Sequence, residues 1–170
     1  MGKNTIKLTM NEKKFLNAIL KHGNVTDTVI CKETGLSKSS CSRIRRKLEG
    51  TLISEYIPII DLNKVGIDVF LVLTFQWTAF DNEQLTKKTF SDFKKDPNVI
   101  FLASGEGSTS STVMFIAFED LESYHLYLKE FRKKYGKYAH QINTLLLPSK
   151  EVIKNDFTEV IREVIGGKQK

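Results

Sequence analysis

Hydrophobic residues follow two different periodicities along the chain. Up to Gly50 they recur every three or four positions, the spacing of one face of an α-helix, and this predicts three short helices. From Leu52 onward they mostly alternate or run together, as in β-strands, and helical spacing returns only in two long stretches and near the carboxyl end. The pattern therefore predicts a helical domain followed by a domain of mixed helices and strands, an α+β protein.

Local signals set the ends of the three predicted helices. The motif TMNE at residues 9–12 fits a capping box at the start of the first helix, and Gly23 ends that helix. The second helix covers about residues 26–34 and stops at Gly35, where the missing Cβ allows a sharp turn. The third helix covers residues 38–49, and Ser37 is expected to cap it. Two helices joined by such a tight turn predict a helix-turn-helix.

The third helix is amphipathic, and its polar side is strongly basic. Cys41, Ile44 and Leu48 form a narrow apolar stripe that is expected to face the core. On the opposite side, Arg43 and Arg46 could donate paired hydrogen bonds to guanine in a major groove, and the cations beside them could contact phosphates. A solvated basic surface is the alternative interpretation. The candidate DNA-binding residues are Ser37, Lys38, Ser39, Ser40, Ser42, Arg43, Arg45, Arg46 and Lys47.

Two short strands are predicted directly after the third helix. Residues 52–56 and 57–61 are rich in β-branched and aromatic side chains, and Pro58 would confine the second strand to an edge. Two strands at this position would form a wing, so residues 1–61 are expected to make a winged helix-turn-helix domain. Residues 62–66 are expected to form an ordered hinge.

The rest of the chain predicts one sheet with two helices. The expected order is strand, helix, strand, strand, helix, strand, which is that of a ferredoxin-like βαββαβ sandwich over residues 67–148. Asp81 is expected to cap the first of these helices. The predicted elements are residues 67–77, 81–96, 99–103, 112–118, 120–135 and 142–147.

The predicted strands are apolar on both faces, as in the run VMFIAF at residues 113–118. Two helices can cover only one face of a sheet, so the second apolar face is expected to be buried in a homodimer. Two-fold symmetry would then place two copies of the basic helix about 34 Å apart, one duplex turn, on a palindromic site.

Charge is distributed unevenly along the 170 residues. The net charge is +6, and residues 1–60 carry all of it, with 11 Lys and Arg against five Asp and Glu. Such an asymmetry suits one domain that neutralises phosphates. No stretch approaches the roughly 20 apolar residues that span a bilayer, and the amino terminus lacks the apolar core of a signal peptide. A cytoplasmic protein is therefore expected.

Together these features resemble the Lrp/AsnC family of bacterial and archaeal transcription regulators. The resemblance rests on GLSKSSCSRIRRKLEG at residues 35–50, on LISEYIPIIDLNKVGID at residues 52–68 and on the βαββαβ order, and it covers about residues 9–148. It implies DNA binding by the first domain and dimers through the second, often assembled into tetramers or octamers. In some members it also implies an amino-acid effector at subunit contacts.

The turn between the two central strands departs from the family pattern. Family members commonly carry a tight Gly-Asp-aromatic-Asp turn there, whereas residues 104–111 are SGEGSTSS, which is longer and lacks the aromatic residue and both aspartates. The departure argues against amino-acid sensing, although the amides and hydroxyls of the turn could hold a small anion. A mobile loop is the alternative. The candidate effector-binding residues are Gly105, Glu106, Gly107, Ser108 and Thr109.

Other reactive side chains do not form a recognisable catalytic or metal-binding motif. Cys31 and Cys41 are expected to be small buried hydrophobes rather than a redox pair. His22, His125 and His140 are isolated in the sequence. Neither an enzyme, a metal site nor a cofactor is predicted.

The sequence leaves two alternative functions open and predicts one additional helix. The βαββαβ sheet could bind RNA by stacking bases on Phe101 and Phe115, although the basic-Gly-aromatic pattern of RNA-binding sheets is missing. The winged helix could instead bind protein. Residues 149–170 contain a short amphipathic helix that Asp156 could cap, expected to pack on the sheet or to extend an oligomer contact.

Overall fold

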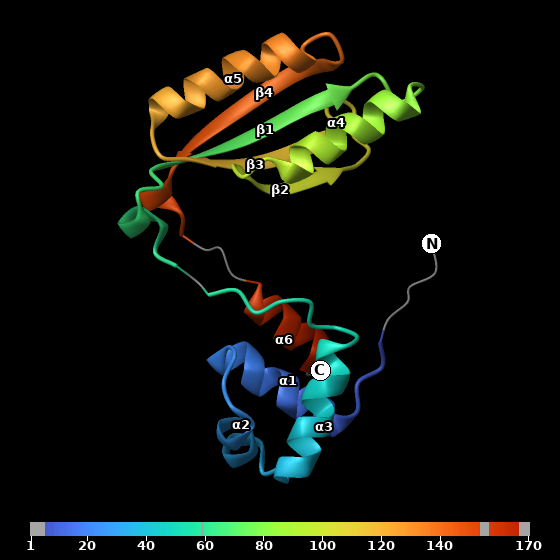
Figure 1. The fold of residues 1–170 in the computed structure, drawn as a ribbon, viewed down its shortest axis with the longest axis vertical. Helices are drawn as coiled ribbons and strands as arrows, with labels where there is room; N and C mark the ends of the chain where they lie inside the picture. Colours follow the sequence, from blue (N-terminus) through green and yellow to red (C-terminus); the bar gives the residue numbers. More distant parts are fainter. Residues whose placement is uncertain (1–5, 59, 154–156, 167–170) are drawn as a thin grey trace. The chain divides into compact units, whose positions relative to one another are not determined.

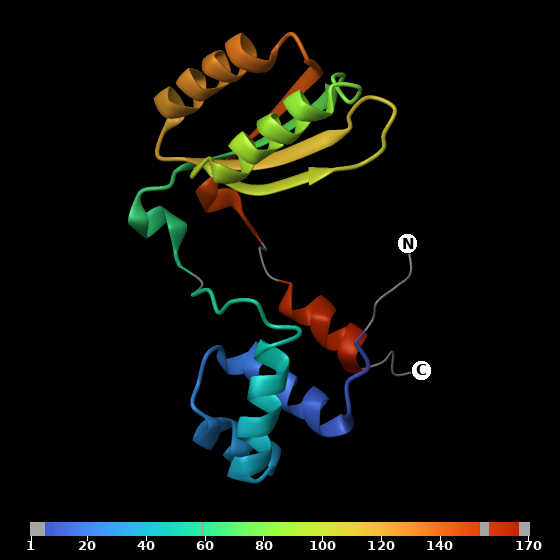
Figure 2. The same ribbon diagram turned by 45° about the vertical axis from the view of Figure 1, so that its right-hand side comes forward.

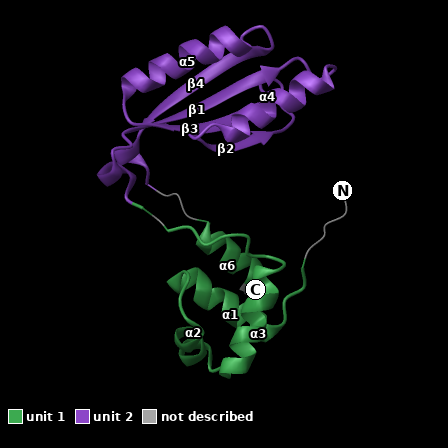
Figure 3. Cartoon of the chain, viewed as in Figure 1, with its two compact units in different colours: residues 1–60, 154–170 green, residues 61–153 purple. Residues whose placement is uncertain are grey.

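The computed structural model describes residues 6–58, 60–153 and 157–166. The chain forms two units, one made of residues 1–60 and 154–170 and the other of residues 61–153, as Figure 3 shows. We call them the helical unit and the sheet unit. The helical unit contains α1 (Met10–His22), α2 (Asp27–Thr34), α3 (Lys38–Glu49) and α6 (Thr158–Gly166) (Figure 1).

The first three helices begin and end where the sequence indicates. At the start of α1, the Thr9 amide donates to Glu12 Oε2 at 2.8 Å and the Glu12 amide donates to Thr9 Oγ1 at 3.3 Å, so the predicted capping box is confirmed. Gly35, with φ +70°, ends α2 in the left-handed region. The core of this unit contains Phe15, Leu16, Ala18, Ile19, Ile30, Cys41, Ile44 and Leu48.

The predicted wing is absent from the part of the chain that the structure describes. Residues 52–58, 60 and 61 contain no strand, and residue 59 lies outside the description. The amides of Leu52 and Ile53 instead both donate to the Leu48 carbonyl, at 2.7 and 2.8 Å, which holds this segment against the end of α3. The two expected strands follow each other directly, which leaves no residues for a hairpin turn, and Pro58 lacks an amide donor. The prediction of a winged domain was therefore wrong.

The sheet unit has the predicted βαββαβ order. Its strands are β1 (Val69–Trp77), β2 (Val99–Ser104), β3 (Thr112–Phe118) and β4 (Ala139–Pro148), and they form one antiparallel sheet in the order β2-β3-β1-β4. Leu71 of β1 pairs with Ile116 of β3 on one side and with Leu146 of β4 on the other. The helices α4 (Glu83–Lys95) and α5 (Leu121–Tyr135) cover one face of this sheet (Figure 1).

The caps of the two sheet-covering helices match the sequence only in part. Asp120, the first residue of the predicted helix 120–135, is the cap of α5, since its Oδ1 accepts from the Ser123 amide at 2.7 Å. The cap of α4 is not Asp81, as predicted, but Asn82, whose Oδ1 accepts from the Leu85 amide at 3.0 Å. Both residue types cap helices well, and only the position of the first turn decides between them.

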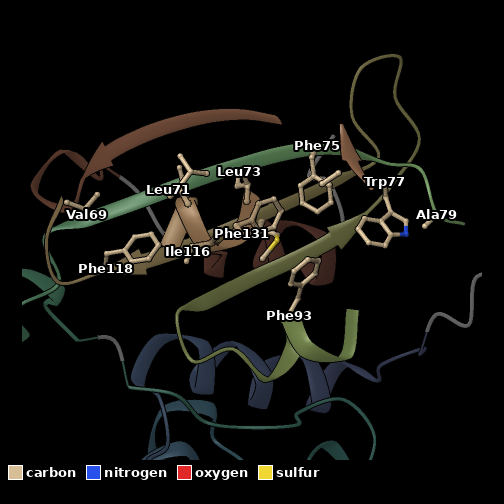
Figure 4. Packing of buried hydrophobic residues seen from close by; sticks show 13 residues of the cluster. Val69, Leu71, Leu73, Phe75, Trp77, Ala79, Phe93, Ile116, Phe118 and Phe131 are labelled. Carbon is tan, nitrogen blue, oxygen red and sulfur yellow. The ribbon is translucent and has the colours of Figure 1, made fainter. Parts of the chain in front are cut away.

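An aromatic core lies between the sheet and its two helices (Figure 4). Phe75 is fully buried and contacts Trp77, Phe93 and Phe131, with ring centroids 6.4, 6.2 and 5.4 Å away. The Trp77 indole Nε1–H donates to Thr86 Oγ1 at 3.0 Å, so its buried polar atom is satisfied. This core fixes α4 and α5 to one face and leaves the other face of the sheet without a covering element in the sheet unit.

The carboxyl-terminal helix packs elsewhere than expected. In Figures 1 and 2, α6 lies beside α1, and Ile165 packs against the core of the helical unit. It is therefore a fourth helix of that unit, whereas packing on the sheet or an oligomer contact was predicted. The predicted cap Asp156 lies outside the described residues. Among the described helices, none has the length and apolar character required to cross a membrane.

Candidate nucleic-acid interface

The outward side of α3 is strongly basic. Ser37 caps the helix, since its Oγ accepts from the Ser40 amide at 3.2 Å. Cys41, Ile44 and Leu48 face the core and are buried, as predicted. Arg43 and Arg46 are exposed on the other side, together with Lys38. The periodicity of apolar residues thus predicted correctly which side of α3 is buried and which is exposed.

Three cations of α3 are available to bind an anionic partner. Lys38, Arg43 and Arg46 make no side-chain hydrogen bond or ion pair with any other residue that the structure describes. Long cationic side chains without an internal partner keep their full charge and hydrogen-bonding capacity for an external one. This surface can therefore bind an anionic partner without breaking contacts of its own.

Arg45 lies in a different environment. Its Nε donates to Asp27 Oδ1 at 2.6 Å, and its Nη2 donates to the Val25 carbonyl at 2.5 Å. The guanidinium also lies 5.5 Å from the centroid of the Phe15 ring. Only 17% of the Arg45 side chain is exposed. These contacts tie α3 to the start of α2, so the Arg45 guanidinium is occupied within the unit.

Lys47 is also paired. Its Nζ lies 2.6 Å from Glu12 Oε1, in the capping box of α1. The Lys47 ammonium, together with the Thr9 amide, lowers the pKa of the Glu12 carboxyl. About half of the Lys47 side chain is exposed (51%). Lys47 can therefore still contact a partner, although Glu12 neutralises part of its charge.

The candidate serines divide into two groups. The Ser37 hydroxyl is occupied as the helix cap and lies within 3.1 Å of the hydroxyls of Ser39 and Ser40. Ser39 is exposed, and Ser40 and Ser42 are half-buried on the edge of the basic face. Ser40 and Arg43 also line a hollow with Asn11 at the start of α1.

Asn11 was not a candidate in the sequence, because its position next to α3 depends on how the helices pack. One sequence signal pointed to it: the first turn of a helix presents unpaired amides that attract anions, and residue 11 lies in the first turn of a recognisable capping box.

The uncovered face of the sheet is uncharged and largely apolar, with Thr74, Gln76 and Asn143 toward one end. The four strands contain no Lys, Arg, Asp or Glu. On this face Phe101 and Phe115 meet edge to face, with centroids 5.6 Å apart, and Phe101 and Leu145 are exposed by 50% and 58%. We call this surface the open face. Its exposed or half-buried side chains include Val72, Phe101, Val113, Phe115, Leu145 and Leu147.

The candidate effector residues are brought together only in part. Gly105, Glu106 and Gly107 line a hollow at one end of the sheet, together with Gln76 and Phe80. Ser108 and Thr109, the other two candidates, are exposed and do not line it. A Cβ on Gly107 would come 2.7 Å from the Ser110 carbonyl oxygen, so the turn requires glycine there. The buried Gln76 Oε1 lacks a hydrogen-bond donor among the described residues.

Solved structures that share this fold include transcription regulators of the Lrp/AsnC class. The regulator NMB0573 of Neisseria meningitidis, solved as a complex with L-Met, has a TM-score of 0.78 at 15% identity, over 89% of this chain and 96% of that one. An AsnC family regulator of Agrobacterium tumefaciens has a TM-score of 0.76 at 19% identity, over 87% of this chain and 94% of that one. The Lrp/AsnC fold that the sequence resembles is thereby confirmed.

A curated relative points to the same class. The transcriptional regulator AzlB of Bacillus subtilis is 25% identical over 124 residues, which cover 72% of this chain and 78% of AzlB. No family model matches the chain. AzlB and the two solved structures above are all named as transcription regulators.

Proposed function

We propose that this protein is a transcription regulator that binds double-stranded DNA through α3 and acts as a homodimer on palindromic promoter sites. The observation that carries the proposal is the division of the cations on α3. Arg45 is engaged inside the helical unit, whereas Lys38, Arg43 and Arg46 are exposed and unpaired among the described residues. The similarity to AzlB and to solved regulators supports the same class of function.

The geometry of α3 suits a major groove. A major groove about 12 Å wide admits one α-helix, and Arg is the side chain that most often donates two hydrogen bonds to guanine. Arg43 and Arg46 are three residues apart and lie on the same side of the helix. We assign base contacts to these two residues. Lys38, and Lys47 with its remaining exposure, are assigned to phosphates.

The open face supplies the reason for a dimer. Exposure of Phe101 and Leu145 to water is unfavourable. Self-association that buries this uncharged face would lower the free energy. A two-fold contact places the same surface of two copies together and presents two α3 helices to one duplex. The lack of cations in the strands also makes RNA binding by the sheet less favourable than dimerisation, because a nucleic-acid surface needs positive charge.

Modulation by a small ligand is part of the proposal. Gln76 lines the hollow beside Gly105 and Gly107, and its buried Oε1 lacks a donor among the described residues; a ligand N–H or O–H that reached this oxygen would satisfy it. NMB0573 was solved with L-Met, so a protein of this fold can bind a small molecule. Thermal shifts with a panel of amino acids, compared between the wild type and Gly107→Ala, test this part separately.

Selection of bound sequences from random duplexes tests the main proposal. We expect a palindromic consensus, and we expect Arg43→Ala and Arg46→Ala to relax the preference at individual bases while costing about 1–3 kcal/mol of affinity. Arg132→Ala, which removes an exposed Arg from α5, is the matched control and should leave the consensus unchanged. Equal losses on selected and scrambled duplexes would remove the base-reading assignment. RNA binding by the open face, or capture of protein alone, would favour the two alternative functions.

A further inference from the structure

The two cysteines of the chain lie next to each other in the helical unit. Cys31 is on α2 and Cys41 on α3, ten residues apart, and their sulfur atoms are 2.7 Å apart. Both are free thiols. The sequence alone predicts two unrelated buried apolar side chains, because the contact between the two sulfur atoms depends on how α2 and α3 pack. The proximity makes a different chemistry available.

The two thiols differ in solvent access. Cys31 is half-buried, at the edge of the helical core, whereas Cys41 is fully buried. Burial, assisted by the contact with Cys31, raises the pKa of the Cys41 thiol to about 11. Cys41 is therefore protonated at neutral pH and shielded from reagents in solution. Cys31 is the thiol that an external molecule can reach.

We propose that Cys31 and Cys41 form a redox-active dithiol that is oxidised to an intramolecular disulfide by low-molecular-weight disulfides. A disulfide bond is about 2.05 Å long, so the sulfurs need only a small displacement from their present positions. In a reducing compartment, disulfides that do form are usually transient and redox-sensing. The site does not depend on the proposed DNA binding, and the experiment below does not measure DNA binding.

The oxidation proceeds by two exchange steps. The Cys31 thiolate attacks one sulfur of the small disulfide, forms a mixed disulfide and releases one small thiolate. Cys41 then gives up its proton and attacks Cys31 Sγ, and a second small thiolate leaves. The two cysteines lose two hydrogen atoms in total, and the small disulfide gains them as two thiols, so atoms and electrons balance. Cys31 is the attacking residue and Cys41 the resolving residue.

The disulfide would connect the two helices on either side of the Gly35 turn. It would close a short loop that contains the end of α2, the turn and the start of α3. Such a crosslink restricts the unfolded chain, and we expect the melting temperature of the helical unit to rise by about 5 °C or more. Because the crosslink joins Cys31 of α2 to Cys41 of α3, it also restricts movement of α3 relative to α2.

The test uses the full chain with oxidised glutathione as the probe, followed by intact-mass and peptide analysis under non-reducing conditions. The wild type should lose two hydrogen atoms, yield a linked Cys31–Cys41 peptide pair and retain no reactive thiol. Cys41→Ala should stop at a stable adduct of one glutathione on Cys31. Cys31→Ser should show no adduct, because the remaining thiol is buried.

Several outcomes would overturn the proposal. A wild-type protein that keeps both thiols, or that carries a stable glutathione adduct without a crosslink, contradicts it. A glutathione adduct on Cys41 in Cys31→Ser contradicts the assigned roles. If Cys41→Ala does not fold, an acid-quenched time course of the wild type replaces it, and the Cys31 adduct should appear before the crosslink.

Discussion

Arg43 and Arg45 are two residues apart on the same helix, yet their surroundings give them different roles. Arg45 donates to Asp27 and to the Val25 carbonyl, and it is mostly buried. Arg43 is exposed, and its guanidinium contacts no other described residue through a hydrogen bond or an ion pair. One side chain therefore holds the helical unit together, and the other is available to a partner.

This difference predicts opposite effects of the same substitution. Arg45→Ala should lower the free energy of unfolding by about 2 kcal/mol, because it leaves the Asp27 carboxylate and the Val25 carbonyl without their donor. Arg43→Ala should change the stability by less than about 0.5 kcal/mol, as for an ordinary surface position. Urea unfolding followed by circular dichroism measures both. Equal stability of the two variants would contradict the structural role of Arg45.

The Glu12 carboxyl predicts a pH dependence of the helical unit. Lys47 and the Thr9 amide lower its pKa below the usual value of 4.5, so the folded state favours the carboxylate. A lowered folded pKa contributes stability above the unfolded pKa, and this contribution is lost as the pH falls through the folded pKa. The wild type should therefore lose stability below about pH 4.5.

Glu12→Gln is the control for this effect. It removes the ion pair with Lys47 and weakens the capping box, so it should be less stable than the wild type at pH 7, by about 1 kcal/mol. The difference between the two proteins should shrink as the pH falls from 6 to 3. A difference that stays constant over this range would show that Glu12 is not responsible.

At the scale of elements, α6 is the addition that distinguishes the helical unit from a three-helix arrangement. Ile165 packs against the core of that unit, whereas the neighbouring Val164 is 77% exposed. Ile165→Ala should lower the melting temperature of the helical unit by a few degrees, since it removes a partly buried side chain worth about 1 kcal/mol. Val164→Ala, which removes a similar side chain from the exposed side, should leave it unchanged. Equal shifts would show that α6 does not pack as described.

Elements with strong local signals were predictable from the sequence. The caps at Thr9 and Ser37 and the turn at Gly35 depend on residues within one helical turn, and all three are confirmed. The strand β3 was predicted with its observed bounds, because its apolar run is continuous. The βαββαβ order followed from these elements.

Features that depend on tertiary contacts were not predictable. The segment after α3 has β-branched residues, but propensity alone does not provide a pairing partner, and its amides bind the end of α3 instead. The position of α6 depends on its contacts with α1 and with the core of the helical unit. The environment of Arg45 depends on where Asp27 lies after α2 and α3 have packed. Helical periodicity placed Arg45 on the flank of α3, and only packing showed what the flank touches.

For the whole molecule, the proposed binding to a palindrome requires a homodimer through the open face. Leu145→Glu would place a charge on this face and should convert the dimer to a monomer without unfolding it, because Leu145 is 58% exposed in the protomer. Leu126→Glu on α5 is the matched control, since Leu126 is also 58% exposed but lies on a helix on the other side of the sheet. Analytical ultracentrifugation should find Leu126→Glu dimeric. A wild type that sediments as a monomer, or a dimeric Leu145→Glu, would contradict this interface.

We expect the two α3 helices of a homodimer to bind one duplex through their unpaired cations. The most direct measurement is the affinity of the full chain for a selected palindromic duplex, by fluorescence anisotropy, at salt concentrations between about 50 and 200 mM. We predict two chains per duplex and an affinity that falls at least about tenfold over this range, with a smaller salt dependence for Lys38→Ala. Binding that does not change with salt, or no binding to any selected duplex, would contradict the account.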